Sequence, residues 1–186
     1  MQRYMINARV LAMRICVRWQ FFIALPAFCL VTRSALGGVL ALQSLIVLML
    51  AHELGHAALA RYCGLQVERI ELHLLQGSCV FSEPRSEIEA IIVSWGGVTA
   101  QLALFVVFEG LYHGVQLSSA GTQFLYPIFA VFIAWNAISL AVNLLPIEGV
   151  DGHTAWKIVP AIRNGAFMEY VRARRAAAPV TLRARQ

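Results

Sequence analysis

Long apolar stretches dominate the chain and alternate with short polar segments. Three of them, residues 34–60, 88–111 and 124–145, are each longer than the roughly 20 residues that a helix needs to cross a bilayer of about 30 Å. Another apolar stretch, residues 19–32, comes first along the chain. It is shorter, contains Pro26, and spans only if it borrows neighbouring residues. The pattern predicts an all-α polytopic membrane protein with about four transmembrane helices.

A polar segment between the second and third of these four apolar stretches has a different period. Ile70 and Leu72 alternate with Glu71 and His73, and a Gln-Gly-Ser turn follows. A period of two is typical of a strand with one apolar face. Because hydrocarbon does not tolerate the unpaired backbone groups of an open sheet edge, residues 66–81 are predicted to form a small β-hairpin at the cytosolic interface.

Composition and charge agree with a membrane protein. The 186 residues are 59% hydrophobic and 13% charged, whereas soluble domains are about 45–50% apolar and about 25% charged. The net charge of +5 comes from arginines near both ends: Arg3, Arg9, Arg14 and Arg18, then Arg172, Arg174, Arg175, Arg183 and Arg185. The positive-inside rule places both termini in the cytosol, and we expect the cell (inner) membrane. The apolar bulk argues against a nucleic-acid partner.

A chain of this length is predicted to form a single core over residues 1–163, followed by a basic tail over residues 164–186. The tail is rich in alanine and arginine. Two interpretations remain open for it: a peripheral helix on anionic headgroups, or a solvated, disordered tail.

The second apolar stretch ends in the motif His-Glu-Leu-Gly-His, residues 52–56. Residues i and i+4 share one face of a helix, so His52 and His56 can bind one metal ion, and Glu53 lies beside them to hold a metal-bound water. Ionisable groups within a membrane helix are usually functional. The alternative, two core histidines bonded to each other, leaves Glu53 buried without a partner.

A catalytic zinc needs a third protein ligand. The candidates are His73, His113, Glu148, Asp151 and His153. The second and fourth apolar stretches run parallel, because one antiparallel span separates them, so the chain leaving residue 145 emerges beside the end of the His-Glu-Leu-Gly-His helix. This favours Asp151 and excludes His113, which follows the third stretch. Pro146 ends the fourth helix, and Gly149 and Gly152 permit a tight return.

These motifs resemble those of the site-2 protease family of intramembrane zinc metalloproteases, peptidase family M50. The resemblance rests on the first motif and on N-x-x-P-x-x-x-x-D-G at Asn143, Pro146, Asp151 and Gly152, and it covers roughly residues 15–160. It implies one zinc ion per chain held by His52, His56 and Asp151, with Glu53 as the catalytic residue.

A third segment, Gly-Gly-Val-Thr-Ala-Gln-Leu at residues 96–102, resembles the glycine-rich motif of that family. It departs from the usual pattern at Val98, where proline is common, and at Gln101, where asparagine is common. Its small residues are explained equally well by close helix packing. Asn143 and Gln101 are candidates for stabilising the oxyanion or holding substrate. Glu148 and His153 lie beside the site in sequence without an assigned role.

The sequence therefore predicts a zinc-dependent endopeptidase that cuts a membrane protein in or near a transmembrane segment, with the active site towards the cytosolic face of the bilayer. Its partners would be that transmembrane substrate, the lipid bilayer and a regulatory membrane partner, as in regulated intramembrane proteolysis. The edge of the 66–81 hairpin is a candidate surface for an extended substrate segment. Two other classes of protein are compatible with a metal-binding motif in a membrane helix: a zinc-bound protein that only binds membrane partners, and a small metal transporter. Glu53 argues against the first, and the absence of an internal repeat argues against the second.

Overall fold

Two long helices that pack against each other form the centre of the structure, α2 (Ala35–Tyr62) and α3 (Glu87–Gly114). The computed structural model describes residues 4–10, 13–73, 76–114 and 119–177. A Cβ on Gly55 of α2 or on Gly96 of α3 would overlap the backbone of the other helix. The two glycines therefore let the helices meet backbone to backbone, as the packing interpretation of residues 96–102 predicts.

The predicted apolar stretches correspond closely to helices. α2 begins after Ser34, whose side chain accepts a hydrogen bond from the Gly37 amide as a helix N-cap. The last stretch forms α4 (Ser119–Phe129), the π-helical segment η2 (Ala130–Trp135) and α5 (Asn136–Asn143). Within the described residues, three helices are long and apolar enough to cross a membrane, the third being Phe124–Asn143.

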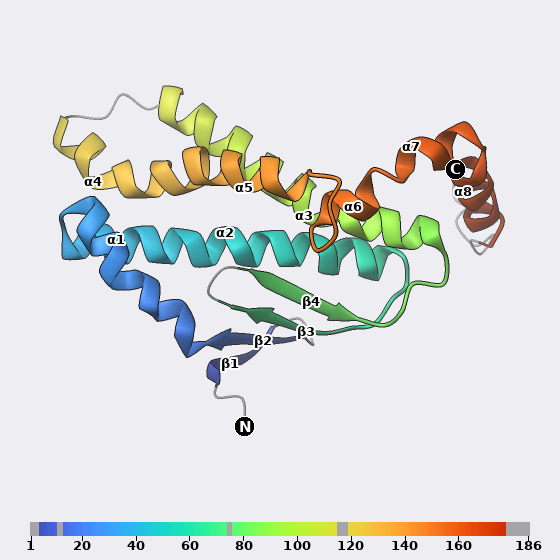
Figure 1. Ribbon diagram of the computed structural model, residues 1–186, viewed down its shortest axis with the longest axis horizontal. Coiled ribbons are helices and arrows are strands. Elements are labelled where there is room, and N and C mark those ends of the chain that lie inside the picture. Colours follow the sequence, from blue (N-terminus) through green and yellow to red (C-terminus); the bar gives the residue numbers. More distant parts are fainter. Residues whose placement is uncertain (1–3, 11–12, 74–75, 115–118, 178–186) are drawn as a thin grey trace, which may run out of the picture.

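The expected count of four spans is not confirmed. Residues 19–32 form the 3-10 turn η1 (Trp19–Ile23) and the helix α1 (Ala24–Thr32). The nine residues of α1 extend only about 14 Å, roughly half the hydrocarbon thickness. The 19–32 segment cannot be extended as a helix before Trp19, because residues 13–18 belong to a β-strand. α1 instead packs along the N-terminal half of α2 (Figure 1).

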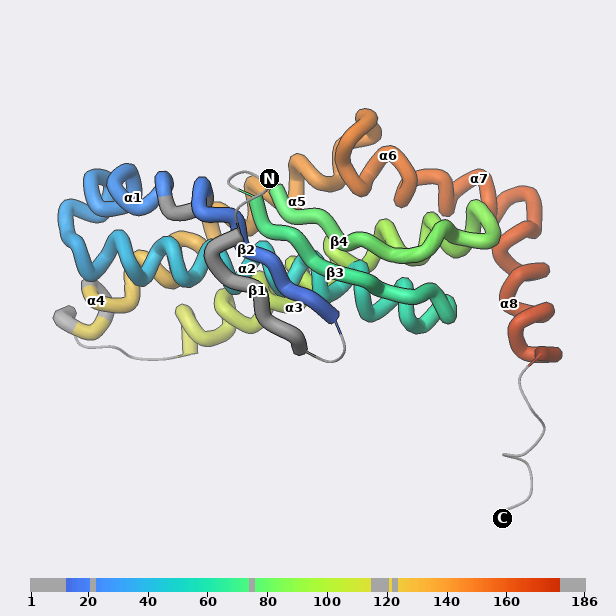
Figure 2. The backbone as a smooth tube through the Cα atoms, turned by 90° about the horizontal axis from the view of Figure 1, so that it is seen from below, coloured from blue at the N-terminus to red at the C-terminus, as the bar shows by residue number. Residues whose placement is uncertain are grey.

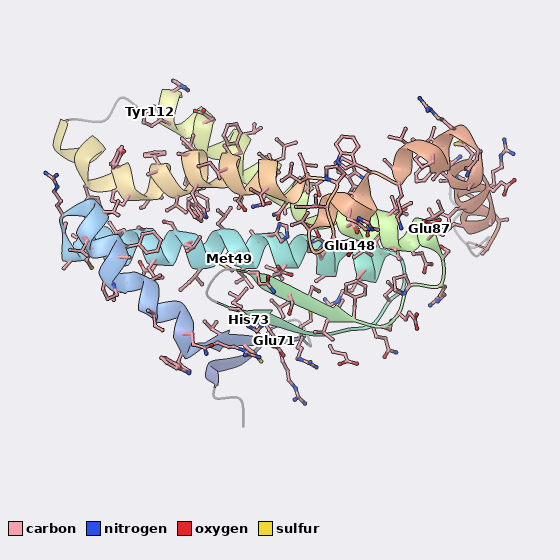
Figure 3. The ribbon with its side chains drawn as sticks, viewed as in Figure 1. Met49, Glu71, His73, Glu87, Tyr112 and Glu148 are labelled. Atoms are coloured by element: carbon pink, nitrogen blue, oxygen red, sulfur yellow. The ribbon has the colours of Figure 1, made fainter. Side chains whose placement is uncertain are left out.

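The helix directions agree with the topology expected from the sequence. α2 and the α4–α5 segment run in the same direction, and α3 runs in the opposite direction (Figure 1). Glu87 and Tyr112 lie at opposite ends of α3 (Figure 3). The short helices α6 (Asp151–Ala155) and α7 (Ile158–Arg163) follow α5. The chain after α5 therefore lies beside the C-terminal half of α2.

A four-stranded sheet covers the side of α2 opposite α4 and α5 (Figures 1 and 2). Its strands are β1 (Tyr4–Val10), β2 (Met13–Arg18), β3 (Val67–Leu72) and β4 (Gly77–Phe81), in that order. β3 and β4 are antiparallel, which confirms the predicted hairpin, while β2 and β3 are parallel. β4 is an edge strand.

The two N-terminal strands are missing from the sequence prediction. Their pattern is present in the sequence, because Met13, Ile15 and Val17 alternate with Arg14 and Arg18. The arginines, however, also fit the cytosolic flank of a membrane span. Met13 and Val17 are buried in the same apolar cluster as Ile70 and Leu72 of β3. The protein is therefore mostly helical, with a sheet larger than one hairpin.

The described part of the C-terminal tail is the helix α8 (Ala166–Ala177). It lies crosswise to α2 and α3 in both views (Figures 1 and 2). Phe167 and Tyr170 pack against the start of α3, and the Arg174 guanidinium lies 4.0 Å from the centre of the Tyr62 ring and hydrogen-bonds the Tyr62 carbonyl. This segment is a helix, and the predicted contact of the tail with anionic headgroups stays a prediction.

Candidate metal centre

Three side chains from two separate elements converge on one point. His52 and His56 lie one turn apart on α2, and Asp151 is the first residue of α6. The two Nε2 atoms are 3.0 Å apart, and Asp151 Oδ2 lies 3.1 Å from His52 Nε2 and 3.2 Å from His56 Nε2. Within the described part of the chain, no other three His, Cys, Asp or Glu side chains gather this closely.

The loop between α5 and α6 returns Asp151 to the helix pair, as predicted. α5 ends at Asn143, three residues before Pro146. Gly149 adopts a left-handed backbone with φ of 92°, and a Cβ on Gly152 would overlap the carbonyls of Leu144 and Leu145. Two glycines thus allow a return that other residues would obstruct.

Two tryptophans hold α6 in place. The Trp95 indole on α3 donates a hydrogen bond to the Ala155 carbonyl at 3.1 Å, and the Trp156 indole donates to the Leu144 carbonyl at 2.7 Å. The first bond fixes α6 to α3, and the second closes the loop after α5. The sequence did not indicate these anchors, because each bond joins an indole to a distant backbone carbonyl.

The hydrogen bonds of both imidazoles define which ring nitrogen faces the centre. His52 Nδ1 lies 3.0 Å from Gln101 Oε1, and His56 Nδ1 lies 2.8 Å from the Val93 carbonyl. Both partners are acceptors, so each Nδ1 carries the proton and each Nε2 presents a lone pair. The two Nε2 lone pairs and the Asp151 carboxylate therefore face one another, an arrangement that repels itself unless a cation lies between them.

The size and chemistry of this donor set fit zinc. Two ligand atoms of a tetrahedral zinc site, each about 2.0–2.2 Å from the metal, lie roughly 3.3–3.6 Å apart. The observed separations of 3.0 to 3.2 Å are only slightly shorter. Two imidazoles and one carboxylate are also a known catalytic zinc set, which keeps a further position open for water.

Glu53 lies beside the donor group and is almost completely buried, with 4% of its surface exposed. The first residue of β4, Gly77, approaches it so closely that a Cβ there would overlap the carboxylate. Among the described residues, no hydrogen-bond donor engages the Glu53 carboxylate. The sheet thus closes one side of the Glu53 position and leaves the carboxylate available for a water molecule.

Gly97 of α3 lies directly against the histidine pair. A Cβ at this position would overlap the rings of both His52 and His56. Gly97→Ala is therefore expected to displace the imidazoles and weaken zinc binding by at least about tenfold, the lower end of the loss when support for metal ligands is removed. The measurement is the zinc dissociation constant from competition with a chromophoric chelator.

Gly110 supplies the matched control for Gly97→Ala. It lies on the same helix, and a Cβ there would meet nothing within 4 Å. Gly110→Ala should leave zinc affinity unchanged. Equal affinities in the two variants would show that Gly97 is not needed for the position of the histidines.

Of the two predicted polar residues of the site, Gln101 contacts His52, and Asn143 contacts Gln101. Gln101 Oε1 accepts from His52 Nδ1 and, at 3.0 Å, from the Asn143 amide, while Gln101 Nε2 donates to the Ser139 hydroxyl at 3.0 Å. Gln101 is buried, with 2% of its surface exposed. The substrate or oxyanion role of Gln101 and Asn143 stays a prediction. Ser139, Val93, Gly77 and Gly97 are neighbours of the site to which the sequence gave no role there.

The centre opens into a cavity of about 590 Å³. Its walls come from α2, α3, α5, the loop before α6 and the edge strand β4. Cys79 of β4 lines it, and burial, followed by the nearby Glu53 carboxylate, raises the pKa of its thiol to about 12. The thiol therefore stays protonated at neutral pH and does not offer a thiolate ligand.

The other candidate ligands lie outside the donor group. His113 pairs with Glu109 at 3.3 Å near the opposite end of α3, as the topology predicts. His73 lies 3.4 Å from Glu71 on the sheet. His153 and Glu148 are exposed, and Glu148 lies on the loop between α5 and α6 (Figure 3).

Known proteins provide an independent comparison. No protein-family model matches the chain. Over 122 residues it is 33% identical to a Mycobacterium tuberculosis protein named as a zinc metalloprotease, Rip3, in strains Erdman and H37Rv. That match covers 62% of this chain but spans only 28% of the relative's length. The solved site-2 protease from Methanocaldococcus jannaschii matches with a TM-score of 0.62 at 19% identity, covering 84% of this chain and 71% of that one. The chain therefore has the fold of a site-2 protease, and the two comparisons confirm its resemblance to the site-2 protease family of membrane zinc metalloproteases.

Proposed function

We propose that the chain is a zinc-dependent intramembrane endopeptidase that hydrolyses a peptide bond in or near a transmembrane segment of a membrane protein. The observation that carries this proposal is the convergence of His52, His56 and Asp151 beside Glu53. The group lies between helices that are long and apolar enough to cross a membrane. A site in that position meets a substrate that is itself in the bilayer.

Each residue of the centre has a distinct task in this proposal. His52, His56 and Asp151 would hold one zinc ion per chain. When bound, zinc supplies a Lewis acid for the scissile carbonyl and lowers the pKa of a bound water to about 7. The Glu53 carboxylate accepts the proton of the attacking water and later donates it to the leaving nitrogen. The burial of Glu53 keeps bulk water from competing for that proton.

The edge strand in the wall of the cavity favours an extended substrate segment. A helix hides its carbonyls in hydrogen bonds four residues apart, so a transmembrane substrate must unwind before attack. The edge strand β4 forms one wall of the cavity, beside Glu53. An unwound segment would pair its backbone with β4 and gain affinity with little dependence on side-chain identity. We expect cuts near glycine, proline or small residues.

The wider setting follows from the arrangement of charge. α8 lies at the end of the molecule where α2 ends and α3 begins (Figure 1). Because α8 carries Arg172, Arg174 and Arg175, the positive-inside rule favours the cytosolic side of the cell (inner) membrane for this end. Regulated intramembrane proteolysis would add a regulatory membrane partner to the transmembrane substrate and the lipid bilayer.

Zinc removal and restoration test the proposed function. The protein is reconstituted with single-span membrane proteins whose spans contain helix-breaking residues, and cleavage is followed by mass spectrometry. Stripping zinc with a chelator is expected to lower the initial rate at least about a hundredfold, and zinc, but not magnesium, should restore it. Cleavage that persists without zinc would contradict the proposal, and cuts confined to unbroken helical segments would contradict the extended substrate.

A further inference from the structure

A group of hydrogen bonds joins α5 to His52, one of the candidate zinc ligands. Gln101 of α3 lies at its centre: its side-chain oxygen accepts from His52 Nδ1 and from the Asn143 amide, and its side-chain nitrogen donates to Ser139 Oγ. Asn136 adds a fourth bond, donating to the Gln101 backbone carbonyl at 2.9 Å. His52 thus shares one hydrogen-bonded group with three residues of α5.

The directions of these bonds leave one orientation for the Gln101 carboxamide. The Asn143 amide nitrogen can only donate, so it must face the Gln101 oxygen, and Ser139 Oγ receives the Gln101 nitrogen on the other side. The oxygen that faces His52 is therefore an acceptor. His52 must carry its proton on Nδ1, and its Nε2 lone pair points to Asp151 and His56.

The three α5 residues share one helix face. Asn136, Ser139 and Asn143 are spaced by three and four residues, and they follow the π-helical segment η2. Asn136 is completely buried. Among the described residues, its Oδ1 has no hydrogen-bond partner, and its Nδ2 donates to the Gln101 carbonyl. Burial of a half-satisfied amide costs free energy, and this bond offsets part of that cost.

We propose that Gln101 is a positioning residue that holds His52 in the metal-binding tautomer and orientation, and that α5 sets this orientation through Ser139 and Asn143. The inference rests on the proposed zinc site, and it assigns Gln101 a task other than substrate binding. Both lone pairs of the Gln101 side-chain oxygen are already used, so the carboxamide oxygen has no capacity left for substrate. Partners that orient a metal-bound histidine typically change metal affinity 10–100-fold when removed.

Two substitutions separate the acceptor from the shape of the side chain. Gln101→Met keeps the length and most of the volume but removes the acceptor. Gln101→Glu keeps an acceptor for His52 Nδ1 and for Asn143, and Ser139 can rotate its hydroxyl to donate. Thr99→Val is the matched control, because Thr99 lies on the same helix and, among the described residues, its hydroxyl bonds the Trp95 and Gly96 carbonyls of that helix.

The measurement is made on the purified full chain in detergent. Zinc dissociation constants come from chelator competition, the visible bands of the cobalt-substituted protein report ligand geometry, and far-UV circular dichroism confirms folding. Gln101→Met should weaken zinc binding about 10–100-fold and shift the cobalt bands. Gln101→Glu should stay within about threefold of the wild type, and Thr99→Val should match it.

Each contrary result has its own meaning. Equal zinc affinity in the wild type and Gln101→Met would overturn the positioning role. Equal losses in Gln101→Glu and Gln101→Met would overturn it as well, because the acceptor would then be irrelevant. A wild type that binds no zinc would overturn the metal centre together with this inference. A zinc-loaded wild type that shows the expected Gln101 effects but cleaves no membrane protein would contradict the proposed function alone.

Discussion

Glu53→Gln is expected to abolish peptide-bond hydrolysis while the protein still binds one zinc ion per chain. Glutamine has nearly the same shape as glutamate, so it fits the buried position beside Gly77. It cannot accept the proton of the attacking water. General base catalysis contributes about 10²–10⁴-fold, so the cleavage rate should fall by at least about a hundredfold. The measurements are the initial rate on a reconstituted transmembrane substrate and zinc per chain.

Glu148→Gln is the control for Glu53→Gln. Glu148 is exposed on the loop before α6 (Figure 3). The same chemical change there should leave both the rate and the zinc content at wild-type values. If Glu53→Gln cleaves at the wild-type rate, Glu53 is not the base. If it loses zinc, Glu53 has a structural role in the centre that the geometry does not indicate.

Asp151→Ala is expected to abolish zinc binding and, as a consequence, peptide-bond cleavage. Asp151 Oδ2 lies within 3.2 Å of both imidazole Nε2 atoms, and removing it leaves two ligands from one helix. Loss of a supporting residue alone costs 10–100-fold in metal affinity, so loss of a ligand should raise the zinc dissociation constant by more than about a hundredfold. Chelator competition measures the constant, and elemental analysis gives zinc per chain.

His153→Ala is the matched control, since His153 lies two residues further along α6 and is exposed. It should bind zinc as tightly as the wild type. The opposite pair of results, with zinc retained in Asp151→Ala and weakened in His153→Ala, would make His153 the third ligand. Loss of zinc in both would point to a change in α6 as a whole, which the circular dichroism spectrum would reveal.

Most of the donor group could be predicted from short-range features of the sequence, namely residue spacing and the length of the apolar stretches. The spacing of His52 and His56 makes them neighbours on any helix, whatever surrounds it. The apolar stretches were long enough to establish helices and their alternating directions. The helix directions predict that Asp151 lies near the two histidines, although it is about 100 residues away in the sequence. The reason is that two parallel helices end on the same side, and the loop after each helix begins there.

The N-terminal strands were not predicted, because the charge of their residues and the period of their apolar positions indicate different structures. The alternation in residues 13–18 indicates a strand, but its arginines also fit a cytosolic flank. Only the parallel pairing of β2 with β3 decides between them, and that pairing joins residues more than 50 positions apart, such as Ile15 and Ile70. The same strand removed the residues that the 19–32 segment needed in order to span.

The sequence by itself determined the helices, the two histidines with Glu53 between them, and the side on which Asp151 emerges. These depend on hydrophobic period and helix spacing, which act over a few residues. The tertiary structure decided the rest: the 3.0 to 3.2 Å approach of the three donor atoms, the acceptors that set both imidazole tautomers, and the edge strand against Glu53. Each of these is a contact between segments far apart in the chain, and its geometry is fixed only when α2, α3, α5 and the sheet pack together.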